Sequence, residues 1–182
     1  MPFNFKKTDI PEIILIEPRI FSDNRGVFLE IYKQSEFKRY GLEKPFCQVN
    51  HSRSKKNVLR GLHYQLAPQA QAKLVHVVSG EIFDVGVDLR RHSATYGQWV
   101  GEILSCQNRK MLYIPEGFAH GFCVLSDIAE VIYHCTAEYS QAHEQGVIWS
   151  DNLLNIQWPI KNPVLSDKDM VLPSLAQAEH NF

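Results

Sequence analysis

The chain has 182 residues, a length that fits one domain. Its content of 45% hydrophobic and 11% aromatic residues excludes a disordered chain. Lys and Arg number 19 and Asp and Glu number 20, so the net charge of -1 lacks the basic excess of a nonspecific nucleic-acid binder.

The sequence contains no apolar run that approaches the roughly 20 residues needed to span a bilayer, and its first residues lack a signal-peptide core. The four cysteines form no Cys-x-x-Cys pair, which argues against a zinc or redox motif. We therefore expect a cytoplasmic protein without nucleic-acid or membrane partners.

Short alternating apolar runs separated by turn residues dominate the chain, a pattern typical of an antiparallel sandwich or barrel. Ser35 is predicted to cap one short helix over residues 36–40, which ends at Gly41. After residue 158 the chain has three prolines and little periodicity, which predicts a coil around the barrel. Strands are predicted at residues 13–16, 26–32, 46–51, 58–65, 73–79, 81–89, 99–104, 110–114, 121–124, 129–136 and 146–148.

Two of the eight histidines stand apart, because His63 lies inside the segment 59–65 and His120 inside the segment 114–122. An isolated histidine on a sheet is more often a hydrogen-bonded core residue than a catalytic one. In a regular strand, Arg60 and His63 would point to opposite faces. If both serve one site, a bulge at Gly61 is the expected solution; otherwise Gly61 only relieves close packing and Arg60 is a surface charge.

Two further side chains stand out for their surroundings. Lys73 shares a predicted strand face with Val75 and Val77, where a lysine is unfavourable unless it is paired or used. Its alternative is an edge lysine whose charged end reaches solvent. Tyr133 shares a face with Val131 and is by default a core residue, although a phenol in a cleft can deliver a proton.

The charged run at 165–169 predicts a solvated loop unless one carboxylate orients a histidine.

Four segments together resemble one family. Their letters are RGLHYQ at 60–65, GEIFDV at 80–85, GQWVG at 97–101 and PEGFAHGF at 115–122. In this order and spacing they are similar to the dTDP-4-dehydrorhamnose 3,5-epimerases, and the resemblance covers about residues 14–169.

The resemblance implies an all-β cupin, a jelly-roll antiparallel barrel with one or two short helices and a C-terminal coil, formed by residues 1–182 as one domain. It implies an epimerase that inverts C3 and C5 of dTDP-4-dehydro-6-deoxy-D-glucose to give dTDP-4-dehydro-L-rhamnose. It also implies a homodimer with exchanged N-terminal strands, about residues 10–35, at its interface. No cofactor is expected.

The resemblance assigns a role to each residue that matches the family pattern. His63 is implied as the base and Asp169 as the carboxylate that orients it, with Tyr133 as the acid on the opposite face and Lys73 beside the enolate oxygen. Tyr139 is implied to stack on thymine. The other implied substrate contacts are Arg25, Glu30, Gln48, Val49, Asn50, Arg60, His120, Glu144 and Lys168.

These residues suit an epimerisation beside a ketone, where the proton on the neighbouring carbon is only weakly acidic. Its removal calls for a base that works near neutral pH, a positive group at the carbonyl oxygen and an acid on the other face. A metal is not expected, because metal-binding cupins use a His-x-His pair and Tyr64-Gln65 follows His63 here.

Two other interpretations are open. A related isomerase that inverts one carbon, or acts on another nucleotide-linked keto sugar, would share all of this chemistry. A sugar-binding module without catalysis would not need Lys73, Tyr133 and Asp169 together.

Overall fold

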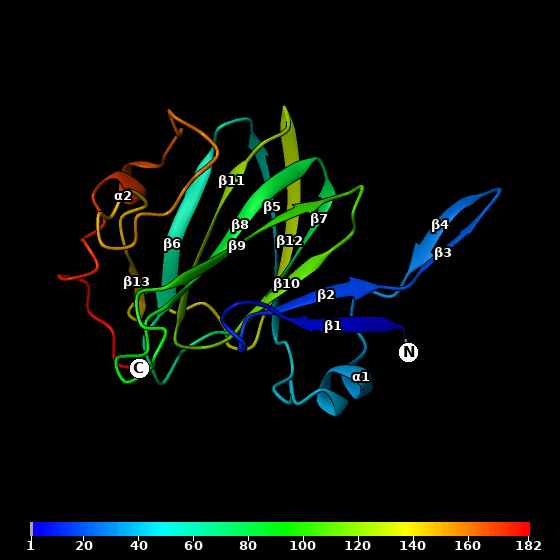
Figure 1. The fold of residues 1–182 in the computed structure, drawn as a ribbon, viewed down its shortest axis with the longest axis horizontal. Helices are drawn as coiled ribbons and strands as arrows, with labels where there is room; N and C mark the ends of the chain where they lie inside the picture. Colours follow the sequence, from blue (N-terminus) through cyan, green and yellow to red (C-terminus); the bar gives the residue numbers. More distant parts are fainter. Residues whose placement is uncertain (1) are drawn as a thin grey trace.

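The computed structural model describes residues 2–182 and shows two antiparallel sheets facing each other (Figure 1). One sheet has the order β1-β2-β10-β7-β12-β5, with β1 (Phe3–Lys7), β2 (Ile14–Pro18), β10 (Met111–Ile114), β7 (Lys73–Ser79), β12 (Ile128–Cys135) and β5 (Gln48–Lys55). The other has the order β13-β6-β11-β8-β9, with β13 (Glu144–Gly146), β6 (Leu59–Gln65), β11 (Phe118–Val124), β8 (Glu81–Asp88) and β9 (Trp99–Ser105). The predicted jelly-roll class is confirmed.

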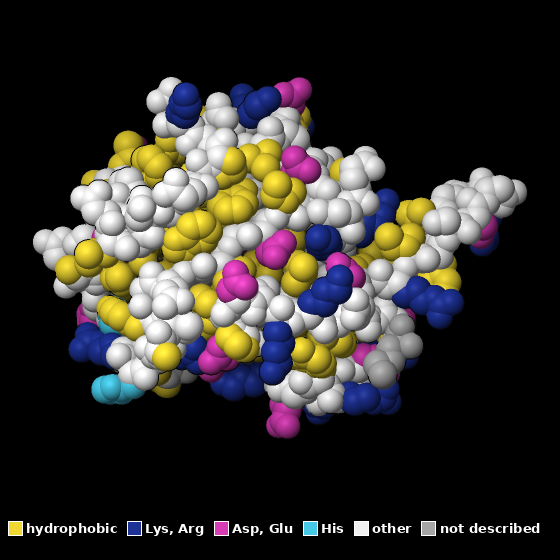
Figure 2. All heavy atoms as spheres, in the orientation of Figure 1, with side chains coloured by type: hydrophobic (Ala, Val, Ile, Leu, Met, Phe, Trp, Pro, Cys, Tyr) yellow, Lys and Arg dark blue, Asp and Glu magenta, His cyan; other side chains and the backbone are white. Residues whose placement is uncertain are grey.

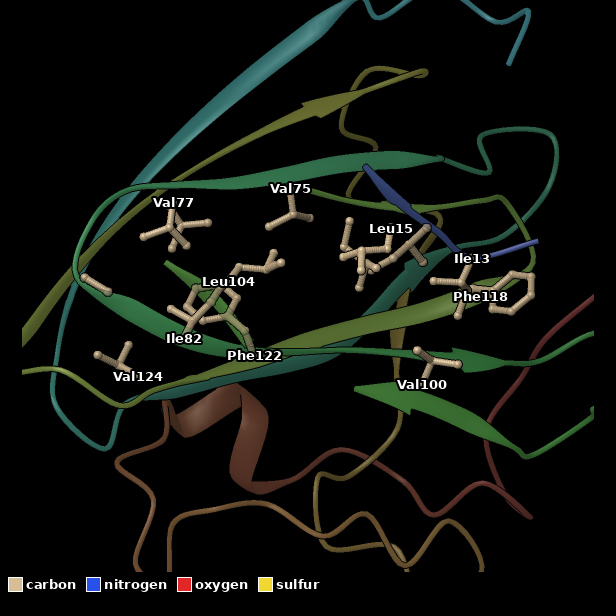
Figure 3. Close-up of a cluster of buried hydrophobic side chains, with 14 of the residues drawn as sticks. Ile13, Leu15, Val75, Val77, Ile82, Val100, Leu104, Phe118, Phe122 and Val124 are labelled. Carbon is tan, nitrogen blue, oxygen red and sulfur yellow. The ribbon is translucent and has the colours of Figure 1, made fainter. Parts of the chain in front are cut away.

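Side-chain alternation along these strands places one apolar face of each sheet against the other. Burial of that apolar surface is the main force that holds the sheets together. Figure 3 shows the resulting core between the sheets. Its labelled members are Ile13, Leu15, Val75, Val77, Ile82, Val100, Leu104, Phe118, Phe122 and Val124.

The N-terminal region adds two strands that the sequence patterns did not predict. They are β1, which pairs with β2, and β3 (Ile20–Asp23), which forms a hairpin with β4 (Gly26–Leu29). All four residues of β3 are exposed, so the strand has no buried face to produce an alternating pattern. The predicted strand at 26–32 is correspondingly shorter.

Helix α1 (Gln34–Arg39) begins earlier than predicted, after Lys33, and no side chain caps it. The prediction that Ser35 is the cap was wrong. Phe37 is 1% exposed and packs edge-on against the rings of Phe3 and Tyr32. Packing of this one aromatic side chain, rather than capping, therefore fixes the helix.

The C-terminal coil is interrupted by helix α2 (Asp167–Met170), where the sequence predicted a loop. The Ser166 hydroxyl accepts a hydrogen bond from the Asp169 backbone N–H at 3.2 Å. This is an ordinary N-cap, and it places Asp169 in the first turn, where a carboxylate is favourable.

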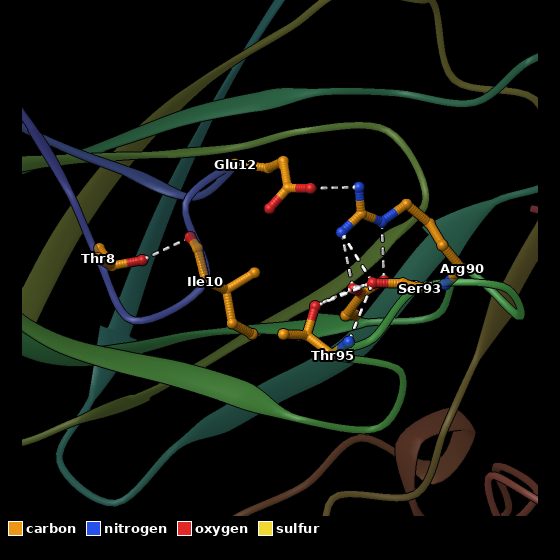
Figure 4. Close-up of polar contacts among 7 residues, drawn as sticks. Thr8, Ile10, Glu12, Arg90, Ser93 and Thr95 are labelled. Carbon is orange, nitrogen blue, oxygen red and sulfur yellow. Dashed lines mark hydrogen bonds and ion pairs between the residues drawn. The ribbon is translucent and has the colours of Figure 1, made fainter.

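A polar network fastens the loop before β2 to the connection between β8 and β9 (Figure 4). Asp88 is fully buried and accepts hydrogen bonds from Arg90, Ser93 and Thr95. Although burial favours the neutral acid, these bonds lower the pKa of Asp88 to about 2. Arg90 also bonds Glu12 at 2.7 Å, so the network joins two distant segments away from the cleft described below.

The β3–β4 hairpin forms an arm that projects from the body of the molecule (Figure 1). Figure 2 shows apolar side chains along this arm. Ile20, Phe21, Val27 and Phe28 are between 42% and 66% exposed. The arm therefore presents an apolar surface that its own subunit leaves open. No helix among residues 2–182 is long and apolar enough to cross a membrane.

Gly61 has a backbone conformation and surroundings that only glycine fits. Its φ is +111°, and a Cβ there would lie 2.6 Å from the Gly121 Cα and from the His120 carbonyl oxygen. We expect Gly61→Ala to lower the free energy of unfolding by roughly 3 kcal/mol or more, as both strain and overlap act. Urea unfolding measures this change.

The matched control is Gly41→Ala. Gly41 also has a positive φ, +94°, but nothing lies within 4 Å of the added methyl group. Strain alone then predicts a loss of about 1 kcal/mol. If both variants lost the same free energy of unfolding, the close approach of β6 and β11 at Gly61 would not contribute to the loss.

Candidate active site

A polar cleft opens between the two sheets, and its walls come from both of them. β6 and β13 supply one side, and β5, β7 and β12 supply the other. The lining is strongly polar, unlike the apolar core beside it. Its residues are Gln48, Asn50, His63, Tyr64, Gln65, Gln71, Lys73, Tyr133, Tyr139 and Glu144.

His63 on β6 meets Asp169 on α2, as the resemblance implies. The Nε2 atom of His63 lies 2.5 Å from Oδ1 of Asp169, whose side chain is 4% exposed. Burial favours the neutral acid, but hydrogen bonds from His63, Ser166 and the Gly61 backbone outweigh it and lower the pKa of Asp169. The carboxylate is therefore ionised and fixes the imidazole through Nε2, which leaves Nδ1 to take a proton.

The expected irregularity at Gly61 is present. His120 on β11 pairs with His63, whereas Phe122, two residues on, pairs with Arg60, three residues back along β6. The extra residue on β6 removes the alternation that would send Arg60 and His63 to opposite faces. Arg60 then reaches β5, where its Nε donates to the Ser54 hydroxyl at 3.0 Å.

Tyr133 on β12 faces the cleft from the sheet opposite His63. Burial raises the pKa of its phenol, while the charge of Arg60 and a hydrogen bond with Asn50 oppose that change. The phenol is therefore protonated at neutral pH and can donate a proton into the cleft.

Lys73 lies at the start of β7, beside the same cleft. Its Nζ is 3.4 Å from the carbonyl oxygen of His63, so the ammonium bridges the two sheets. Burial lowers the pKa of Lys73, and the neighbouring Cys135 and Asp84 oppose that shift. The Lys73 amino group thus lies within the same space as His63 and Tyr133, and in its protonated form it supplies positive charge there.

His120 forms a second histidine–carboxylate pair, deeper in the barrel. Its Nε2 lies 2.7 Å from Oδ1 of Asp84, and the side chains are 7% and 0% exposed. Burial lowers the pKa of His120 despite the Asp84 charge. Sequence reasoning missed Asp84. An acidic residue inside the apolar β8 segment was the available signal, because a buried carboxylate needs a partner.

The predicted contacts on β5 divide between its two faces. Gln48 and Asn50 point into the cleft and are joined by a 2.9 Å hydrogen bond. The Val49 side chain, between them, points outward and is 59% exposed. Val49 is therefore not brought into the lining of the cleft.

Tyr139, Glu144 and Lys168 form a hydrogen-bonded group at the mouth of the cleft. The Tyr139 hydroxyl donates to Glu144 at 2.8 Å, and Lys168 Nζ lies 2.5 Å from the other carboxylate oxygen. Burial favours neutral Glu144, but these two partners lower the pKa of its carboxyl. The Tyr139 ring is 55% exposed and free to stack on a planar group.

Arg25 and Glu30 are not brought to the cleft of their own chain. Arg25 is on the projecting arm, where its side chain is 86% exposed and pairs with Asp23. Glu30 follows the arm and lies 4.0 Å from Lys33. Within residues 2–182, no group of three or more His, Cys, Asp or Glu side chains is placed to hold a metal ion.

The cleft thus has an oriented histidine on one sheet, a phenol and an ammonium on the other, and polar groups at its mouth. This arrangement can remove a proton from one face of a bound carbon acid, stabilise the resulting oxyanion, and return a proton to the other face.

Comparisons with known proteins give a consistent result. The family model for dTDP-4-dehydrorhamnose 3,5-epimerase matches residues 7–177. The curated enzyme of that description from Shigella flexneri is 55% identical over 92% of this chain and 93% of its own length. The one from Salmonella typhimurium is 51% identical over 94% of this chain and 95% of its own.

Solved structures agree with the sequence relatives. A dTDP-6-deoxy-D-glucose-3,5-epimerase from Legionella pneumophila, in complex with dTDP-4-keto-L-rhamnose, superposes with a TM-score of 0.93 at 46% identity, covering 96% of this chain and 94% of that one. A 3'-monoepimerase from Streptomyces bikiniensis, in complex with dTDP-quinovose, has a TM-score of 0.89 at 35% identity, covering 93% and 87%.

Proposed function

Because the chain belongs to the dTDP-4-dehydrorhamnose 3,5-epimerase family, we propose that the cleft between its two sheets carries out the family reaction with the residues described above. The protein is an isomerase of dTDP-L-rhamnose biosynthesis. It inverts C3 and C5 of dTDP-4-dehydro-6-deoxy-D-glucose and gives dTDP-4-dehydro-L-rhamnose.

His63 is the base in this proposal. Neutral His63 removes the proton from the carbon beside the C4 ketone and becomes an imidazolium. The buried Asp169 carboxylate, 2.5 Å from Nε2, stabilises that charge. The electrons of the broken C–H bond form the enolate, whose oxygen Lys73 stabilises from across the cleft.

Tyr133 completes each inversion by returning a proton from the opposite face. The observation that carries the proposal is the placement of His63 and Tyr133 on opposite sheets that line one cleft. C3 and C5 flank the same ketone, so one set of residues serves both carbons when the sugar ring shifts between the two steps.

The test is an NMR time course with dTDP-4-keto-6-deoxyglucose. Conversion to the product inverted at C3 and C5 supports the proposal. A product inverted at C3 alone would assign the chain to the activity of the Streptomyces bikiniensis relative. Binding with no change of the sugar would identify a sugar-binding module.

We further propose that residues 2–182 act as one domain and that two copies form a homodimer through the arm. The arm is apolar and exposed, and it projects from the body of its own subunit. A closed two-fold dimer would bury this surface in both subunits. Arg25, exposed on the arm, then contacts the diphosphate in the partner's cleft, with Glu30 nearby. A cytoplasmic location stays a prediction from the sequence.

Mixing inactive subunits tests this sharing of sites. Alone, Arg25→Ala is expected to lose about 10-fold to 100-fold in kcat/KM, because a charged hydrogen-bond donor to the substrate is removed. His63→Ala is inactive. Equal mixing is expected to restore about one quarter of the wild-type sites, because half of the dimers are mixed and each has one intact site.

Sedimentation at micromolar concentration accompanies the mixing experiment and measures whether the subunits form dimers. If Arg25 acts within its own subunit, both sites of every mixed dimer are defective and no activity returns. A fully active monomer would also contradict the shared site.

A further inference from the structure

Asp169 lies on a segment that the backbone holds only at its two ends. We call residues 165–172 the strap. Before it, Val164 pairs with Val58, and its carbonyl accepts a hydrogen bond from Leu59 N–H at 3.0 Å. After it, the Pro173 carbonyl accepts from Ile148 N–H at 2.8 Å. The position of the carboxylate that orients His63 therefore depends on what holds the strap between these anchors.

Only two side chains of the strap form hydrogen bonds or ion pairs with the rest of residues 2–182. Asp169 contacts His63 and the Gly61 backbone, and Lys168 contacts Glu144. Apolar packing is confined to the two ends of the strap, where Leu165 and Leu172 are half-buried and the Leu172 side chain lies against Gly146. Between them, Met170 and Val171 are 52% and 80% exposed. Among residues 2–182, the Lys168–Glu144 ion pair is thus the one polar side-chain contact that holds the strap without involving Asp169.

Glu144, the partner of Lys168 in this ion pair, is held in place by the sheet. It belongs to β13 and pairs in register with Gln65 on β6, two residues after His63. Lys168, one residue before Asp169, therefore binds a carboxylate that is held in the same strand frame as His63. The second carboxylate oxygen of Glu144 accepts from the Tyr139 hydroxyl at 2.8 Å.

We propose that Glu144 and Lys168 are positioning residues, which hold the strap so that Asp169 meets His63 and which link this pair to Tyr139 at the mouth of the cleft. The inference rests on the proposed role of His63 and Asp169. It adds to the substrate contacts that the resemblance implies, because it assigns Glu144 and Lys168 a role in the free protein.

Amide hydrogen exchange in the free protein tests the first step without any substrate. Glu144→Gln and Lys168→Met each break the ion pair, and we expect exchange of the strap to rise about tenfold in both. Lys168→Arg keeps the pair and should restore slow exchange. Unchanged strap exchange in Glu144→Gln and Lys168→Met would overturn the proposal, whether or not the reaction is assigned correctly.

The matched control is the Lys44–Glu116 ion pair, at 2.7 Å, which involves no residue of the strap. Lys44→Met should leave exchange of the strap at the wild-type rate. A rise there equal to that in Lys168→Met would show a general loosening of the protein and would also overturn the proposal.

Kinetics separate positioning from a merely structural or contact role. A misplaced Asp169 weakens the base, so kcat is expected to fall roughly tenfold in both variants and to recover in Lys168→Arg.

If Glu144 and Lys168 acted only as separate charges near His63, their removal would change kcat in opposite directions. If they acted only as substrate contacts, KM would rise while kcat stayed unchanged. Either result would contradict the positioning role.

Discussion

His63→Ala is expected to abolish proton exchange at both carbons beside the ketone. In the structure, His63 is the only histidine of the cleft lining, and its Nδ1 is left free by the Asp169 contact at Nε2. Loss of a general base lowers rates by about 10²-fold to 10⁴-fold. Exchange of the C3 and C5 protons with solvent, followed by NMR, measures the effect.

The matched control for this substitution is His92→Ala, which removes an exposed histidine outside the cleft. It should exchange both protons at the wild-type rate. Asp169→Asn is expected to retain the fold and lose about 10²-fold or more, because the imidazolium loses its charged partner. Full activity of His63→Ala would exclude His63 as the base.

Tyr133→Phe is expected to separate proton exchange from inversion. The substitution removes only the hydroxyl, so His63 can still remove and return a proton from its own sheet. We expect solvent deuterium to enter the sugar while inversion at one or both carbons is lost. Product analysis by NMR compares the two rates in one sample.

The matched control is Tyr113→Phe, which removes the hydroxyl of a buried tyrosine on β10, outside the lining of the cleft. It should leave both rates near those of the wild type. Equal loss of exchange and inversion in Tyr133→Phe would indicate that Tyr133 supports the structure and does not donate the proton.

Local patterns predicted the strands in which buried apolar residues contrast with exposed or turn residues at the ends of the run. Residues 73–79 were predicted with the observed bounds of β7, because Val75 and Val77 face the core and Ser79 ends the strand. The exposed β3 has no such contrast, and α1 depends on Phe37 packing against distant rings. A short window of sequence contains neither an alternating pattern for β3 nor the distant rings against which Phe37 packs.

The site shows the same division between local and distant information. Gly61 indicated the irregularity in β6 because only a break could bring Arg60 and His63 to one side. The contact between His63 and Asp169 spans 106 residues of sequence, so the family resemblance, rather than any local pattern, predicted it. Asp84 was missed because its partner His120 lies on another strand.

The central claim is that one base, His63, serves both carbons, and deuterium counting in heavy water tests it most directly. The wild-type protein should incorporate deuterium at C3 and at C5 of dTDP-4-keto-6-deoxyglucose, and His63→Ala should incorporate none at either carbon. Persistent exchange at one carbon in His63→Ala would show a second base and would contradict the account.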